Sequence, residues 1–261
     1  MQWANSLPRF TAIVGVPRSG VIIASMLATY QNTHVISLND LVWGVENWKQ
    51  PLRRNCPGGD GPILVVDDTV ATGGKMNEVK ALCKDLPYPI SFGAYLAMNQ
   101  GKNLVDHYFE DVGNTDHLFQ FNIFHHWFNQ RTFTDLDGVL SEDWNHDHET
   151  GDLAETYANH LENSRCLFRP SFPLKAIVTG RLESHREVTE AWLAGHGIQY
   201  SQLIMFPAFK PENRHDVGLW KGMIYKQSDA ILFVESCPHQ SQRIREVSGR
   251  DVLDWSRQRL V

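Results

Sequence analysis

Two series of short apolar runs, each ending in a polar turn that leads into a helical stretch, constrain the fold of this chain most strongly. In the first series we expect strands over 11–16, 34–38, 62–66 and 91–98, and helices over 21–30 and 75–86. In the second we expect strands over 131–136, 176–178, 203–206 and 230–234, and helices over 152–167, 183–196, 215–227 and 240–247. Strands that alternate with helices predict mostly parallel sheets with right-handed crossovers.

The predicted fold class is therefore α/β with two domains, each a mostly parallel sheet flanked by helices. The boundary is expected after the aromatic and histidine-rich stretch FQFNIFHHWF, which gives domains over 1–128 and 129–261. No flexible linker is visible there. The second series has only a short segment between its first two strands, which predicts a minimal cap over its site.

Net charge indicates the kind of partner, and cysteine spacing indicates the cellular compartment. The 261 residues carry a formal net charge of −6, whereas a protein that binds extended nucleic acid usually has a basic surplus. We therefore do not expect extended nucleic acid as a partner. The four cysteines are scattered without CxxC spacing, which is typical of free thiols in a reducing cytosol. The N-terminus does not resemble a signal peptide, and no apolar run is long enough to span a membrane. We expect a cytoplasmic protein with small-molecule substrates, and a homodimer is left open.

The segment ILVVDDTVATGGKM is the most specific feature of the first half. Four apolar residues predict a strand buried on both faces, and Asp67 and Asp68 follow at its carboxyl end, where open α/β sheets bind ligands. Gly73 and Gly74 then lead into a helix, where backbone N–H groups and the helix N-terminus favour an anion. Two carboxylates beside such a loop suit ribose hydroxyls or a bound divalent cation.

This segment resembles the PRPP-binding signature of type I phosphoribosyltransferases. The resemblance implies that Asp67 and Asp68 contact the ribose, and that the 5′-phosphate is bound by Ala71, Thr72, Gly73, Gly74 and Lys75. Lys75 departs from the usual Thr or Ser, and its charge would face the phosphate. The upstream VGVPRSG is similar to the family's pyrophosphate loop, which implies binding by Arg18, Ser19 and Gly20. The family's mobile loop corresponds to 39–61, where Arg53 and Arg54 would close over the reacting centre.

The base accepted by the first half stays open. Ala71 stands where 6-oxopurine members of the family carry an aspartate, as in adenine-type sequences. Lys102 lies where such members hold a lysine against the exocyclic oxygen, but a solvated lysine in a turn is an equal alternative. Trp43, Trp48, Phe121 and Trp127 are candidates to stack on a base, although aromatic residues more often pack.

The segment FTDLDGVL is the most specific motif of the chain. It places two carboxylates, Asp135 and Asp137, at one turn after a buried strand, and Gly138 permits the sharp bend. Phosphoryl transfer to a carboxylate needs a nucleophile, a positioned acid/base and cations that neutralise the phosphate oxygens. The spacing supplies the first two of these and helps to bind Mg²⁺.

The motif resembles motif I of the haloacid-dehalogenase superfamily. By that resemblance Asp135 is the nucleophile that forms an aspartyl-phosphate, and Asp137 is the general acid/base. AIVTGR is similar to motif II, in which Thr179 binds the phosphate with Arg181 nearby. Lys221 best fits motif III, with Lys226 a weaker alternative.

The Mg²⁺ site is the weakest part of the resemblance. Motif IV usually supplies two acids, whereas ILFVESCPHQ supplies Glu235 followed by Ser236. The metal ligands are predicted to be Asp135, Asp137 and Glu235, with an inactive relic domain as the alternative. The run His146–Asp147–His148 also suggests a metal site, but such a run on an irregular loop is more often solvated.

Together the two halves predict a bifunctional enzyme. The first would join a nucleobase to PRPP, and the second would remove the 5′-phosphate of the nucleotide to leave a nucleoside. The alternative is a phosphatase for an unrelated sugar phosphate or nucleotide, with a regulatory first domain that binds PRPP or nucleotides.

Overall fold

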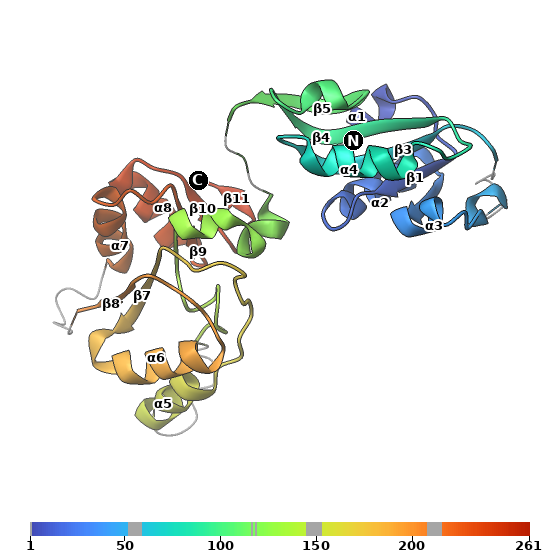
Figure 1. The fold of residues 1–261 in the computed structure, drawn as a ribbon. Helices are drawn as coiled ribbons and strands as arrows, with labels where there is room; N and C mark the ends of the chain where they lie inside the picture. The colour runs from blue at the N-terminus through green and yellow to red at the C-terminus, as the bar shows by residue number, and fades with distance from the viewer. Residues whose placement is uncertain (1, 52–58, 116, 118, 145–152, 208–215) are drawn as a thin grey trace. The chain divides into compact units, whose positions relative to one another are not determined.

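The computed structural model describes residues 2–51, 59–115, 117, 119–144, 153–207 and 216–261. The chain forms two compact units, Met1–His117 and Leu118–Val261 (Figure 1). Each unit has its own sheet. No helix within the described ranges is both long enough and apolar enough to cross a membrane.

The first unit is built on a five-stranded sheet in the order β2-β1-β3-β4-β5, in which every pair of neighbours is parallel. The strands are β1 (Ala12–Gly15), β2 (His34–Ser37), β3 (Ile63–Val70), β4 (Ile90–Met98) and β5 (His107–Gly113). The helices are α1 (Gln2–Ser6), α2 (Gly20–Gln31), α3 (Leu38–Val42) and α4 (Gly74–Cys83), with short 3-10 turns over Asn47–Lys49 and Lys102–Leu104. The strand order reverses between β1 and β3, which is the position where sheets of this kind bind ligands.

Both faces of this sheet are covered. The side chains of the central strands point alternately to one face and the other, and those on both faces are apolar. Leu64 and Val66 of β3 pack with α1 and α2 on one face. Ile63 and Val65 pack on the other face with residues of α3, α4 and Trp48. Their full burial leaves only the carboxyl ends of the strands and the turns that follow them to form a site.

The second unit is built on a six-stranded sheet in the order β11-β10-β9-β6-β7-β8. The strands are β6 (Thr132–Thr134), β7 (Ala176–Leu182), β8 (Leu203–Phe206), β9 (Leu232–Glu235), β10 (Val252–Asp254) and β11 (Arg259–Leu260). The α-helices are α5 (Leu153–Asn163), α6 (Arg186–Gly195), α7 (Val217–Lys226) and α8 (Pro238–Ser248), and 3-10 turns span Gln120–His125, Trp127–Arg131 and Glu183–His185. Neighbouring strands are parallel except β10 and β11. The strand order reverses between β6 and β9, beside Asp135 and Glu235.

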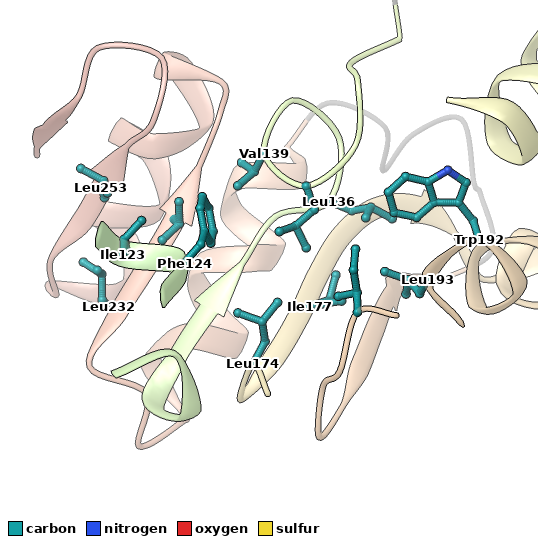
Figure 2. Close-up of a cluster of buried hydrophobic side chains, with 13 residues drawn as sticks. Ile123, Phe124, Leu136, Val139, Leu174, Ile177, Trp192, Leu193, Leu232 and Leu253 are labelled. Atoms are coloured by element: carbon teal, nitrogen blue, oxygen red, sulfur yellow. The ribbon is translucent and has the colours of Figure 1, made fainter. Parts of the chain in front are cut away.

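Two clusters of buried side chains cover the two faces of the second sheet. One contains Trp192 and Leu193 of α6 together with Leu136 and Ile177 (Figure 2). The other packs Tyr225 of α7 and Ile244 of α8 against the central strands; its remaining members are Phe133, Ala176, Val178, Ala230, Phe233 and Val252. Both faces of β6 are therefore buried, and the first charged residue after the strand is Asp135, which is itself buried.

The structure agrees with the predicted fold class, since both units are parallel sheets flanked by helices. Two details differ. The division between the units falls after His117 and not after residue 128, because Ile123 and Phe124 pack into the core of the second unit. Strand β3 continues through Val70 and not only to Val66, because its backbone stays paired with β4 as far as Ala97.

Candidate functional sites

The first candidate site brings together two of the predicted PRPP-binding segments. A Cβ atom added to Gly20 would lie 3.0 Å from Oδ1 of Asp67 and 2.7 Å from the carbonyl oxygen of Val66. The backbone N–H of Val16 donates to the same carbonyl oxygen at 2.9 Å. The turn that holds Arg18 and Ser19 therefore adjoins the first of the paired acids, and glycine at position 20 is what permits the close approach.

The paired acids lie in an environment that suits a hydroxyl or a cation. The Asp68 N–H donates to Oδ1 of Asp67 at 2.9 Å, so the two residues are held close together. Burial, and then the neighbouring Asp68, raise the pKa of Asp67 to about 8. A carboxyl group with so high a pKa gains from hydroxyl donors or from a divalent cation carried by the substrate.

The loop after β3 has the backbone expected of an anion-binding turn. Gly73 has φ +84°, and an added Cβ atom would lie 2.0 Å from Cδ1 of Leu104, so conformation and space both require glycine. Ala71, Thr72 and Gly74 are exposed, and α4 begins at Gly74. The side chain of Lys75 pairs with Glu78 at 2.7 Å on the surface, which differs from the expectation that its charge faces a phosphate.

Other candidates in the first half have different outcomes. Trp48 is fully buried among core side chains and cannot stack on a base, whereas Trp43 is 74% exposed. Lys102 forms an ion pair with Asp111 at 2.9 Å. Arg53 and Arg54 lie outside the described residues, as do His146, Asp147 and His148 in the second half. The bond between Thr69 Oγ1 and His117 Nε2, 3.2 Å long, had no signal in the sequence because 48 residues separate the partners.

The second candidate site is centred on a buried lysine between two carboxylates. Nζ of Lys221 lies 2.9 Å from Oδ2 of Asp135 and 2.7 Å from Oε2 of Glu235. All three side chains are almost completely buried. Burial and then the charge of Glu235 raise the pKa of Asp135 well above its ordinary value, although Lys221 opposes them. Burial alone would lower the pKa of Lys221, but the two carboxylates together outweigh it and raise the pKa.

The turn after β6 presents Asp135 and Asp137 in fixed positions. The Asp135 side chain accepts the Leu136 N–H at 2.9 Å. Gly138 has φ +75°, and an added Cβ atom would lie 2.6 Å from Cβ and Oγ of Ser236. Oγ of Ser236 in turn donates to the carbonyl oxygen of Asp137 at 2.9 Å. Glycine at 138 thus allows the turn to pack against the segment that follows β9.

Asp137 is held by Arg181, a contact that the sequence did not indicate. Nε and Nη2 of Arg181 donate to the two carboxylate oxygens at 2.9 and 2.6 Å, and Oγ of Ser141 donates to Oδ1 at 3.0 Å. Burial would raise the pKa of Asp137, but His160 and Arg181 outweigh it and lower the pKa to about 2. Asp137 is therefore ionised at neutral pH, which suits a general base, whereas the predicted acid function needs a proton that this environment disfavours.

Thr179 lies in the middle of β7, which pairs with β6, the strand that ends just before Asp135. Its Oγ1 accepts the Arg181 N–H at 3.1 Å and keeps its own proton free to donate. Lys226, the alternative to Lys221, is exposed at the end of α7 and belongs to no such cluster in the described part of the unit. The positions of Asp135, Thr179 and Lys221 are thus compatible with the roles that the resemblance implies.

The three predicted metal ligands do not form a metal-binding set as they stand. Both carboxylate oxygens of Glu235 are occupied, one by Lys221 and the other by the Cys237 N–H at 3.0 Å. Asp137 faces Arg181. Among the residues that the structure describes, no three His, Cys, Asp or Glu side chains group as metal ligands would. Binding of Mg²⁺ by Asp135, Asp137 and Glu235 stays a prediction.

Comparison with known proteins leaves the activity to be argued from these sites. No protein-family model and no curated protein matches the sequence. Solved structures similar to the chain include a purine phosphoribosyltransferase from Pyrococcus horikoshii Ot3, with 20% identity and a TM-score of 0.29 over 41% of this chain and 76% of that chain. A xanthine-guanine-hypoxanthine phosphoribosyltransferase from Helicobacter pylori has 17% identity and a TM-score of 0.28 over 40% and 69%. A chain of the Pnkp1/Rnl/Hen1 RNA repair complex has 12% identity and a TM-score of 0.36 over 95% and 96%.

Proposed function

We propose that the chain is a bifunctional enzyme whose second unit hydrolyses phosphate monoesters. The observation that carries this proposal is the buried Lys221 bridging Asp135 and Glu235 at the point where the strand order reverses. A buried lysine beside a carboxylate holds that carboxylate in position. It also stabilises the negative charge of the carboxylate in a place that water does not reach. A purely structural core has little use for three buried charges at this edge of the sheet.

The proposed reaction has two steps. A carboxylate oxygen of Asp135 attacks the phosphorus atom, the bond from phosphorus to the leaving oxygen breaks, the leaving oxygen takes a proton from solvent, and an aspartyl-phosphate forms. Water then attacks the phosphorus atom, the bond from phosphorus to the Asp135 oxygen breaks, and Asp137 takes a proton of that water; inorganic phosphate leaves and Asp137 returns the proton to solvent. Lys221 and Thr179 would stabilise the charge on the phosphoryl oxygens.

We propose further that the first unit transfers phosphoribosyl from PRPP to a nucleobase, releasing pyrophosphate. Support comes from the closeness of Gly20 to Asp67 and from the glycine turn at Gly73 that opens α4. Asp67 and Asp68 would take the ribose hydroxyls, the loop after β3 the 5′-phosphate, and the turn at Arg18 the pyrophosphate. The nucleotide product would then be dephosphorylated by the second unit.

Two variants of the second unit test the phosphatase. Asp135→Asn removes the nucleophile and should lower phosphate ester hydrolysis on the order of 10³-fold or more. Asp229→Asn, an exposed carboxylate of the same unit, is the matched control and should leave the rate unchanged. Wild-type rates in Asp135→Asn would refute the phosphatase.

For the first unit, calorimetry with PRPP and Mg²⁺ should show binding that the double change of Asp67 and Asp68 to Ala abolishes. Hydrolysis of a generic ester by the same variant should persist, because the residues lie in different units. Binding of PRPP without any transfer to a panel of bases would instead favour the regulatory alternative.

A further inference from the structure

A group of aromatic side chains lies beside Asp137 in the second unit. Trp144 packs edge-on against Tyr157, with ring centroids 5.2 Å apart, and against His160 at the same distance. Tyr157 also contacts His185 at 5.7 Å. The rings come from three segments: the residues after the motif I turn, helix α5, and the 3-10 turn after β7.

These rings adjoin the catalytic carboxylate. Nε2 of His160 lies 3.8 Å from Oδ1 of Asp137, which is close but too long for a hydrogen bond. The charges of Asp137 and Arg181 both act on the Tyr157 hydroxyl, whose pKa is raised by burial and then by Asp137. The water that Asp137 deprotonates attacks the phosphorus atom from the position that the leaving oxygen has vacated, so this side of Asp137 is where the leaving group would lie.

The rings are not part of the core. Trp144, Tyr157, His160 and His185 all stay partly exposed, and neither Trp144 nor Tyr157 is a member of the two described core clusters of this unit. A cap that served only to cover the sheet would bury its large rings. Partly exposed rings beside a reacting centre offer a surface on which another flat ring can stack.

Two buried nitrogen atoms beside the rings can take a further hydrogen bond, that of Arg181 as a donor and that of His160 as a donor in the tautomer with its proton on Nε2. Within the described residues, Nη1 of Arg181 and Nε2 of His160 have no hydrogen-bond partner. A buried donor without a partner costs free energy, on the order of 1–3 kcal/mol. Both belong to side chains that contact Asp137, so a leaving group with oxygen atoms could satisfy them on binding.

We propose that Trp144, Tyr157 and His160 form a leaving-group subsite for a nucleoside, with the base stacked on the rings and sugar or base oxygens accepting from Arg181 and His160. The inference rests on the proposed phosphatase and names its substrate class as nucleoside monophosphates, in preference to simple sugar phosphates. Stacking tolerates any base, so the subsite does not depend on the base that the first unit accepts.

The test compares kcat/KM for four nucleoside 5′-monophosphates with that for ribose 5-phosphate, which is the same ester without a base. The wild type should prefer the nucleotides by at least about tenfold, and Tyr157→Leu should reduce that preference by about 5- to 100-fold. Tyr157→Phe, which keeps the ring, should retain the preference. Tyr30→Leu, an exposed tyrosine of the first unit, is the matched control and should not change it.

The outcomes separate the subsite from the phosphatase. If circular dichroism shows that Tyr157→Leu does not fold, Trp144→Leu tests the same subsite. An unchanged preference in the folded variants, or a wild type that does not prefer nucleotides, would overturn the subsite and leave the phosphatase standing. A wild type that hydrolyses none of these esters, while Asp135 also fails to matter for any generic ester, would remove the phosphatase itself and the subsite with it.

Discussion

Removing the amino group of Lys221 tests the buried charge cluster most severely. In Lys221→Met two carboxylates, Asp135 and Glu235, would be left in one buried site without the cation that lies 2.9 and 2.7 Å from them. Breaking a buried ion pair by removing one partner costs about 3–5 kcal/mol, because the remaining charge is uncompensated. We expect a loss of this size in the free energy of unfolding of the second unit.

Hydrogen exchange measured by mass spectrometry reads this loss in peptides of β6 and β9 without interference from the first unit. Amide exchange of those strands should accelerate by roughly 10²- to 10³-fold at neutral pH. Lys221 opposes the rise in the pKa of Asp135, so without Lys221 this pKa rises further in the folded state, and above about pH 4 the folded state binds more protons than the unfolded state. The destabilisation should therefore grow as the pH rises above about 4.

Lys226→Met is the matched control, since Lys226 lies exposed on the same helix and should change exchange little. Phosphatase turnover should also fall steeply in Lys221→Met and stay near wild type in Lys226→Met. Equal exchange in the two variants, or a loss that shrinks as the pH rises, would refute the buried charge cluster.

Three further predictions follow from single contacts. Arg181→Met should destabilise the second unit by about 3–5 kcal/mol. Because the pKa of Asp137 is lowered to about 2 in the wild type, the difference in the free energy of unfolding should be full above pH 4 and should shrink towards pH 2, as acid titrations followed by circular dichroism would show. Gly138→Ala, with φ +75° and a Cβ atom 2.6 Å from Ser236, should cost about 1–3 kcal/mol in urea unfolding and lower kcat, and wild-type values would contradict the turn geometry. The affinity for PRPP, measured by calorimetry, should rise between pH 6 and 8 by up to about tenfold per pH unit. The reason is that the Asp67 carboxyl has a pKa of about 8 and must lose its proton to accept hydrogen bonds from hydroxyl groups. The rise should vanish in Asp67→Asn.

The sequence predicted most of the strands, because buried parallel strands are continuous apolar runs. Strand β8 was predicted with its observed bounds, Leu203–Phe206. Strand β5 was missed because four consecutive residues of it are exposed at the edge of the sheet, so it has no apolar pattern. Strand β10 is only three residues long. The extension of β3 through Asp67 and Asp68 was missed because two acidic residues read as a turn, whereas pairing with β4 keeps them in a strand.

The sequence also indicated the candidate site residues, but not how their side chains pair. Asp135 and Lys221 come together because the strand order reverses between β6 and β9, which no local pattern reveals. Arg181 follows Thr179 in an apolar run, and nothing in the sequence indicated its pairing with Asp137, 44 residues away. Glu235 was expected to bind a metal, which stays a prediction; the sequence did not indicate that Lys221 lies 2.7 Å from the same buried carboxylate.

The measurement that most directly tests sequential action is the product analysis of wild type and Asp135→Asn incubated with PRPP, Mg²⁺ and a panel of bases. With an accepted base, the wild type should release pyrophosphate, inorganic phosphate and nucleoside with little monophosphate, because the second unit removes the product of the first. Asp135→Asn should accumulate the nucleoside 5′-monophosphate in mass spectrometry, since only the second step is blocked. If Asp135→Asn accumulates no nucleotide with any base that the wild type accepts, the two units do not act in sequence.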